Sequence, residues 1–245
     1  MQPTVQDRSG PDSHRKSAIA VGLLILLGYL AYGSATAVIA SMLEAPDALT
    51  TVAANTTQLG IGAILMLVNS LAVVAIGVLM YRVAKPHGEG IALGYVGTRI
   101  FESIVLAVGI VFLLLQIPLA GQAAEASAAG AASLEILSNL ASQANFFAYQ
   151  IAMIGLGVGS VPFWYLIYRA RLVPRSLAAL GIVGYAIFAG GAVLGVVGVE
   201  AGLILSIPGG LFEVAVAIWL IARGFSSPVT APRAVPADAS MAVAR

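Results

Sequence analysis

Two charged side chains lie three residues apart inside an apolar segment. The segment GYVGTRIFESIVLAVGIVFLLLQ, residues 94–116, contains Arg99 and Glu102 and otherwise has the composition of a membrane-spanning helix. A third charge, Glu213, interrupts another apolar segment near the end of the chain. A charge at such a depth costs at least about 2.5 kcal/mol on insertion scales, so each one needs a partner or a function.

The sequence predicts that Arg99 and Glu102 face the inside of a helix bundle. At positions i and i+3 they share one helix face with Tyr95 and Ser103, which makes a polar stripe on an apolar helix. Ionisable residues in membrane helices face the bundle interior or a water-filled cavity rather than lipid. The stripe is therefore expected to point toward the other helices.

Arg99 and Glu213 are predicted to lie at one depth. Arg99 is ten residues from Glu89 and Glu213 is ten residues from Arg223, so both lie roughly 15 Å from the same membrane surface at 1.5 Å per residue. The other four predicted helices each place a polar residue nine to thirteen positions from their basic ends: Tyr29, Asn69, Ser160 and Tyr185. Tyr32, Ser70, Gln150 and Ser206 do not all fit this layer. The candidate binding residues are Arg99, Glu102, Glu213, Tyr95 and Asn69.

Two interpretations of this layer stay open. In the first, Arg99 pairs with Glu213, with or without Glu102, and the buried ion pair only specifies which helices pack together. In the second, the layer is a polar cavity that binds a small molecule or ion. Because one arginine faces two carboxylates, Glu102 or Glu213 could then also hold a proton.

The residues that are missing limit the chemistry. The chain has no cysteine, which excludes thiolate nucleophiles and zinc–thiolate sites. Its two histidines, His14 and His87, fall in a terminal segment and a loop, so no predicted helix carries a histidine for a metal, haem or Ser-His site. We expect no cofactor, no metal and no catalytic residue, and an enzyme would have only Glu102 and Glu213 as an acid–base pair.

Composition identifies the elements that carry these charges. The chain is 60% hydrophobic and 9% charged, against roughly 25% charged in soluble domains. Charge-free stretches cover 17–43, 48–81, 136–168 and 176–199, and two further stretches, 91–119 and 202–222, are interrupted only by the three charges above. Each exceeds the roughly 20 residues that cross a bilayer. The prediction is an all-α bundle of six transmembrane helices.

The six helices are expected to form one membrane domain over 16–225, with disordered tails at 1–15 and 226–245. The pattern Ala35-Thr36-Ala37 also fits a signal-peptidase site. The apolar run continues to Leu43, however, which favours a membrane helix. The alanine-rich segment from Ala120 to Ala144 is expected to be helical.

Basic residues predict the orientation. They fall before the first helix, between helices two and three and between helices four and five, and after the sixth: Arg8, Arg15, Lys16, Arg82, Lys85, Arg169, Arg171, Arg175, Arg223, Arg233 and Arg245. The other three connections carry only acidic charges: Glu44, Asp47, Glu125, Glu135 and Glu200. Cytoplasmic loops hold the excess of Lys and Arg, so both termini are expected in the cytoplasm. The preference for arginine over lysine and the many alanines suggest a bacterium, and hence its inner membrane.

A helix breaker lies close to one of the charges. Pro208-Gly209-Gly210 precedes Glu213 by three residues in the sixth predicted helix. The glycines alone fit close helix packing. A proline also frees a backbone carbonyl, which can line a cavity.

Several short motifs occur in a fixed order along the chain: Ala45-Pro46-Asp47-Ala48, Ala53-Ala54-Asn55, Lys85-Pro86, Arg99 with Glu102, Tyr168-Arg169, Pro174-Arg175, Pro208, Glu213, Trp219-Leu220 and Gly224-Phe225. With these motifs the chain resembles the DUF4386 family of bacterial multi-pass membrane proteins, a domain of unknown function, from about Arg15 to Phe225. The resemblance implies the six-helix topology and implies no activity.

The hypothesis from sequence is a membrane protein that binds or translocates a small molecule or ion through a polar layer. The alternative is a structural or regulatory membrane protein whose charges only specify packing. The expected partners are the lipid bilayer and a small-molecule or proton ligand, and no nucleic acid. A cavity that reaches Glu213 would favour the first hypothesis, and a dry, fully paired cluster would favour the alternative.

Overall fold

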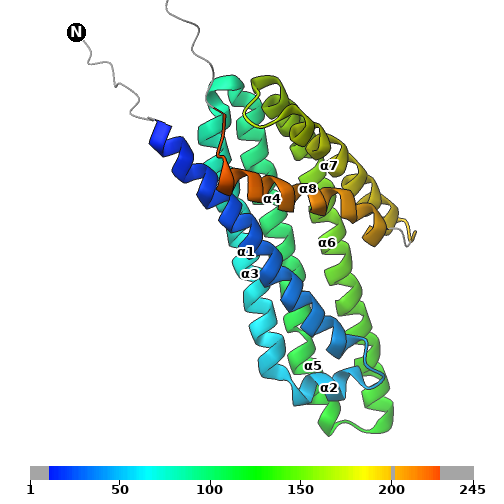
Figure 1. Cartoon of the computed structure of the whole chain (residues 1–245). Coiled ribbons are helices and arrows are strands. Elements are labelled where there is room, and N and C mark those ends of the chain that lie inside the picture. The colour runs from blue at the N-terminus through cyan, green and yellow to red at the C-terminus, as the bar shows by residue number, and fades with distance from the viewer. Residues whose placement is uncertain (1–10, 200–201, 227–245) are drawn as a thin grey trace, which may run out of the picture.

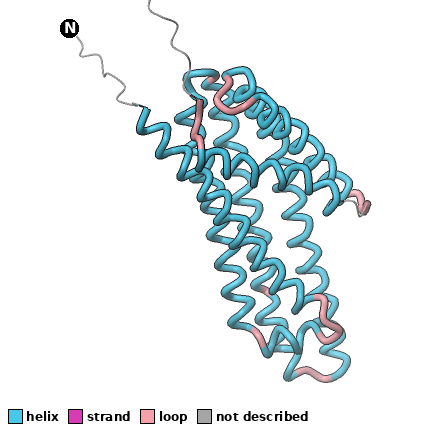
Figure 2. The backbone as a smooth tube through the Cα atoms, in the orientation of Figure 1, coloured by secondary structure: helices cyan, strands magenta, loops and turns pink. Residues whose placement is uncertain are grey.

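The computed structural model describes residues 11–199 and 202–226, in which every regular element is a helix (Figures 1 and 2). The elements are α1 (Pro11–Leu43), α2 (Ala48–Ala54), α3 (Thr56–Ala84), η1 (Lys85–His87), α4 (Glu89–Leu114), α5 (Gln116–Glu125), α6 (Ala128–Ala170), α7 (Arg175–Val196) and α8 (Gly202–Ala222). In this part of the chain, six helical segments are long and apolar enough to span a membrane. They contain α1, α3, α4, α6, α7 and α8, so the predicted all-α bundle of six spanning helices is confirmed.

Some boundaries differ from the prediction. Helix α1 begins at Pro11, so residues 11–15 are helical although they were expected in a tail. Of the tails predicted over 1–15 and 226–245, residues 1–10 and 227–245 lie outside the described residues. The segment from Ala120 to Ala144 forms the end of α5 and the beginning of α6, as its alanines indicate. The stretch 48–81, predicted as one spanning helix, is divided at Asn55 into the short helix α2 and the spanning helix α3.

The six long helices form a closed ring. Each packs against the next in the order α1, α3, α4, α6, α7 and α8, and α8 packs against α1. In Figure 1 α8 is strongly inclined to the long axis of the other helices. Such a ring encloses a space that every helix can reach with one face.

The two ends of the bundle differ in charge. The start of α1 and the end of α8 meet, because Arg15 donates from Nη1 to the carbonyl of Leu220 at 3.0 Å and from Nη2 to that of Ile221 at 2.7 Å. We call this the basic end; it also holds Arg82, Arg169 and Arg175. The opposite, acidic end is formed by α2, α5 and the beginning of α6, at the bottom of Figure 1.

The ring is complete only in the half near the basic end. Helix α6 has 43 residues and α7 has 22, which correspond to about 65 and 33 Å at 1.5 Å per residue. The last turns of α7 reach only as far as Gln150 of α6, whose Nε2 donates to the carbonyl of Ala192 at 3.4 Å. The beginning of α6 therefore extends beyond the end of α7, toward the acidic end (Figure 1).

Glycines set the closest approach between α7 and α8. A Cβ atom at Gly184 would lie 3.2 Å from Gly209 Cα and 3.2 Å from the carbonyl oxygen of Pro208. Small residues let membrane helices approach to this distance. The packing interpretation of the glycines is correct here, and this contact fixes the part of α8 that precedes Glu213.

Candidate functional site

A cavity of about 600 Å³ occupies the interior of the ring, and all six long helices contribute to its wall. We call it the central cavity. Its polar lining residues are Tyr29, Tyr32 and Thr36 from α1, Asn69 from α3, Arg99 and Glu102 from α4, Tyr149 from α6, Tyr185 from α7, and Ser206 and Glu213 from α8. Apolar side chains from the same helices form the rest of the wall, among them Ile25, Val73, Leu106, Met153, Phe188 and Ile207.

One wall of the central cavity carries a buried ion pair within α4. Arg99 Nη1 lies 2.7 Å from Glu102 Oε2, and the two residues are 4% and 3% exposed. Their i, i+3 spacing places both on one face of the helix, as predicted. Arg99 Nε also donates to the hydroxyl of Tyr95 at 3.0 Å. The guanidinium is thus held by two groups of its own helix.

Tyr95 accepts a hydrogen bond from Arg99 but does not line the central cavity. It is 2% exposed, and its ring stacks on that of Phe163 from α6 with 3.8 Å between the centroids. On the other side, a Cβ atom at Gly77 of α3 would lie 3.0 Å from Arg99 Cβ. The arginine stem is therefore packed closely between helices, which limits its movement.

The pairing of Arg99 with Glu213, one of the interpretations of the sequence, is not formed. Among the described side chains, Arg99 has a carboxylate within 4 Å only at Glu102. The physical reason is local: a carboxylate three residues further along the same helix is already within reach. Glu213 approaches from α8, on another part of the ring.

Glu213 lies on the opposite side of the ring and is partly exposed to the central cavity. Tyr185 of α7 donates a short hydrogen bond from its hydroxyl to Glu213 Oε1. The Tyr185 ring meets Phe212 edge to face, which holds it in place. No arginine, lysine or histidine of the described residues lies within 4 Å of the Glu213 carboxylate. Its charge is therefore not balanced by a direct ion pair there.

The helix breaker in α8 forms the wall next to Glu213. Pro208 lies inside the helix, and Gly209 and Gly210 both line the central cavity. The hydroxyl of Tyr29 lies 3.4 Å from the carbonyl oxygen of Gly210, to which it donates. Backbone therefore borders the cavity at this point, as the sequence suggested.

The structure brings four of the five candidate residues to the central cavity: Arg99, Glu102, Glu213 and Asn69. Asn69 fits because the facing residue on α1 is Gly28, where a Cβ atom would lie 2.6 Å from Asn69 Oδ1. The side-chain amide of Asn69 makes no hydrogen bond to another described residue, so it is free to contact a ligand. Tyr95, the fifth, does not line the cavity and contacts it only through its hydrogen bond with Arg99.

The predicted polar layer is correct for Tyr29 and Tyr185 and wrong for Ser160. Ser160 is fully buried, lies outside the cavity lining and has no hydrogen-bond partner for its Oγ. Helix α6 instead contributes Tyr149, whose ring stacks on Tyr32 with 6.1 Å between the centroids. Tyrosines in the middle of otherwise apolar helices were the signal that could have identified both residues.

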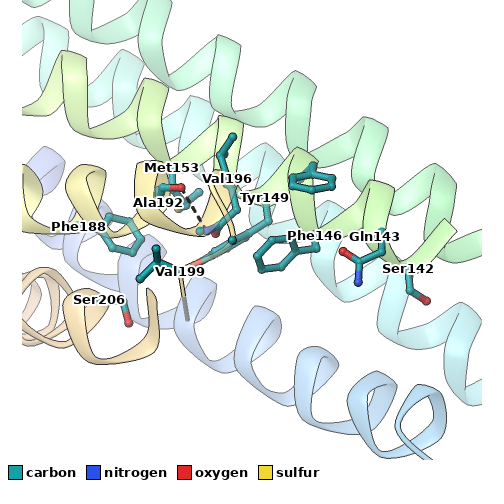
Figure 3. A pocket seen from close by; sticks show the side chains of 14 residues that line it. Ser142, Gln143, Phe146, Tyr149, Met153, Phe188, Ala192, Val196, Val199 and Ser206 are labelled. Atoms are coloured by element: carbon teal, nitrogen blue, oxygen red, sulfur yellow. Dashed lines mark hydrogen bonds between the residues drawn. The ribbon is translucent and has the colours of Figure 1, made fainter. Parts of the chain in front are cut away.

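A second pocket of about 730 Å³ adjoins the central cavity on the side of α6, α7 and α8, and we call it the vestibule. Its lining residues are Ser142, Gln143, Phe146, Phe147, Tyr149, Gln150, Met153, Phe188, Ala192, Gly195, Val196, Gly198, Val199 and Ser206. Four of them, Tyr149, Met153, Phe188 and Ser206, also line the central cavity. In Figure 3, Ser142 lies at one end of the vestibule and Ser206 at the other, with Tyr149 between them. The two spaces therefore share a wall formed by these four residues.

The family of the chain follows from comparison with known proteins. The model of the domain of unknown function DUF4386 matches residues 20–224. The chain belongs to the DUF4386 family. A comparison with curated proteins and one with solved structures found no match.

Membership agrees with the range of the resemblance seen in the sequence, which ran from about Arg15 to Phe225. The match covers all six spanning helices except the first turns of α1, so the whole central cavity belongs to the DUF4386 domain. The family description names no activity, so the geometry of the central cavity carries the functional proposal.

Proposed function

We propose that this DUF4386 protein binds or translocates a small molecule or ion through the central cavity. One observation carries the proposal: a cavity inside a ring of six membrane-spanning helices reaches the carboxylate of Glu213. A volume of about 600 Å³ falls within the range of small-molecule sites, roughly 300–1,000 Å³. The wall also has the composition of such sites, a mostly apolar surface with a few polar groups.

The alternative is a protein in which the buried charges only specify helix packing. That hypothesis requires a dry and fully paired cluster. Arg99 and Glu102 form such a pair. Glu213, however, faces the central cavity and accepts a hydrogen bond from Tyr185, and no cationic side chain among the described residues lies within 4 Å of it. A charged side chain at this depth costs free energy, so its presence there indicates a function. Glu213 therefore favours binding or translocation over a packing role.

We further propose that the protein lies in the bacterial inner membrane with both termini in the cytoplasm. The support is the separation of charges: the basic end carries arginines on four helices, and the short connections at the acidic end carry Glu44, Asp47 and Glu125. Cytoplasmic loops hold the excess of basic residues.

Accessibility of introduced cysteines tests the central cavity, because the chain has no cysteine of its own. Asn69→Cys places a thiol on the cavity wall, whereas Ser70→Cys, one residue further, places it at a position that is 1% exposed and outside the lining. We expect a small water-soluble thiol reagent to modify the first variant and spare the second.

Thiols at Thr36 and Ala35 give a second matched pair on α1, where Thr36 lines the cavity and Ala35 is buried. If the cavity-facing thiols of both pairs react no faster than the buried ones, the cavity is dry and the proposed function fails. Labelling of Glu44→Cys in intact cells by an impermeant reagent, with Arg171→Cys labelled only after lysis, is the result expected for the proposed orientation.

A further inference from the structure

We propose that the ligand of the central cavity is an amphiphilic organic cation, with its cationic group at Glu213 and its apolar body against the aromatic wall. This inference rests on the proposed function, since it names the class of molecule that the same cavity takes. Charge, wall chemistry, size and access each point to this class.

The charges of the cavity wall leave one carboxylate over. Arg99 is neutralised by Glu102 at 2.7 Å, and both are almost completely buried. Glu213 adds a second carboxylate, and the other polar lining residues are tyrosines, Thr36, Asn69 and Ser206, which carry no formal charge. The formal charge of the wall is therefore −1 when both carboxylates are ionised. Charges act strongly in a space enclosed by apolar helices, so the cavity attracts a cation and disfavours an anion.

The wall around that carboxylate is aromatic. Tyr29, Tyr32, Tyr149, Tyr185 and Phe188 line the central cavity from α1, α6 and α7. The face of an aromatic ring attracts a cation, and aromatic cages with such faces are a recurrent way to bind quaternary ammonium groups. The same rings offer apolar surface to the rest of an organic molecule.

A hydrated metal cation fits this wall poorly. Hard cations such as calcium take six to eight oxygen ligands, mostly from carboxylates and carbonyls. Among the described residues no group of three or more His, Cys, Asp or Glu side chains comes together. One free carboxylate in a space of about 600 Å³, lined mainly by apolar side chains, matches a larger organic ion that brings its own apolar surface.

The vestibule adjoins the central cavity, and as the proposed access route it has the same apolar character. No lining residue of the vestibule carries a formal charge, and Phe146, Phe147, Val196 and Val199 make its surface largely apolar. The amides of Gln143 and Gln150 and the hydroxyl of Tyr149 provide polar contacts along it. An amphiphilic cation can pass such a surface, and it meets its counter-charge only at Glu213.

Binding of tetraphenylphosphonium to the purified full-length protein tests the inference, with tetraphenylborate as a probe of the same shape and opposite charge. We expect equilibrium dialysis to find the phosphonium bound at least tenfold more tightly than the borate. Glu213→Gln is expected to weaken phosphonium binding at least tenfold and to leave the weak borate binding unchanged or stronger. Glu135→Gln, which removes an exposed carboxylate of α6 outside both pockets, is the matched control and is expected to bind as the parent does.

Two further measurements keep the test decisive. Glu213→Asp retains the charge, so it is expected to keep the preference for the phosphonium even if Glu213→Gln folds poorly. The phosphonium is also expected to slow thiol modification of Asn69→Cys. Equal binding of the two ions, or phosphonium binding that Glu213→Gln leaves intact, would overturn the inference.

The failures of the two proposals can be told apart. If Asn69→Cys reacts with the water-soluble reagent but the phosphonium does not bind, the cavity exists and only the cation assignment is wrong. Tighter binding of the borate leads to the same conclusion and indicates a site for anions near Arg99. If Asn69→Cys is not modified and no probe binds, both proposals are wrong.

Discussion

Glu102 and Glu213 line the same cavity, but they sit in opposite environments. Glu102 is paired with Arg99 three residues earlier on the same helix and is almost completely buried. Glu213 is partly exposed to the cavity and accepts a hydrogen bond from Tyr185, a residue of the neighbouring helix. The charge of Glu102 is balanced within α4, whereas Glu213 has no Arg, Lys or His of the described residues within 4 Å.

This contrast bears on the packing hypothesis. An ion pair that joins two helices can specify which helices pack together, as a buried polar contact sets the register in a coiled coil. The Arg99–Glu102 pair lies within one helix, so it forms whichever helices surround α4. It cannot therefore specify neighbours by pairing across the ring. Arg99 and Glu102 instead give the wall of the cavity a fixed, neutralised polar patch, beside which Glu213 is the unbalanced charge.

The largest loss of stability is expected when only Arg99 of the Arg99–Glu102 pair is replaced. Arg99→Gln leaves the Glu102 carboxylate buried without its cation, which typically costs about 3–5 kcal/mol of unfolding free energy. The double variant Arg99→Gln with Glu102→Gln removes both charges and is expected to recover most of that loss. Denaturant titration in mixed micelles, completed as a double-mutant cycle, measures the coupling.

Arg171→Gln, a change of the same kind at an exposed position of the basic end, serves as the control and is expected to change stability by less than about 0.5 kcal/mol. If Arg99→Gln is as stable as this control, the pair does not stabilise the fold. Glu102 and Glu213 would then not differ in their contribution to stability.

A smaller loss of stability is expected at the contact between Gly184 of α7 and Gly209 of α8, which precedes Glu213. Gly184→Ala would bring a methyl group to 3.2 Å from backbone atoms of Pro208 and Gly209, which cannot move aside as a side chain can. Such overpacking costs about 1–3 kcal/mol. Gly190→Ala, in the same helix, meets no atom within 4 Å and is expected to be neutral or slightly stabilising. Thermal unfolding in detergent compares the two, and equal stability would show that α8 is not held at this contact.

The sequence was sufficient for the fold because the signals for spanning helices are local. Roughly 20 apolar residues are needed to cross a bilayer, and the charge-free stretches counted along the chain correspond to the helices that the structure has. The division between α2 and α3 at Asn55 was not predicted because no charge, proline or glycine interrupts the stretch there. The early start of α1 at Pro11 was missed because the polar residues there resemble a disordered tail.

The site was only partly predictable because depth and direction are separate properties. Counting residues from the basic end placed Tyr29, Asn69 and Tyr185 level with the charges, and the structure puts all three on the cavity wall. Depth does not say which way a side chain points around its helix, so Ser160 was included wrongly and Tyr149 was missed. The choice of Glu102 over Glu213 as the partner of Arg99 required the distances themselves.

The smallest loss of stability is expected when Glu213, the carboxylate without an ion pair, is replaced. This variant distinguishes Glu213 from the Arg99–Glu102 pair most directly. Glu213→Gln keeps an oxygen that can accept the hydrogen bond from Tyr185. The change breaks no ion pair among the described residues, because Arg99 is paired with Glu102. The weaker hydrogen bond of a neutral acceptor is offset by removal of a charge from an apolar surrounding, so unfolding free energy is expected to change by less than about 1 kcal/mol. Measured under the same conditions as Arg99→Gln, a loss of comparable size would mean that Glu213 is retained for stability. A small loss combined with weaker binding of an organic cation would mean that the chain tolerates the cost of Glu213 because a ligand needs its charge.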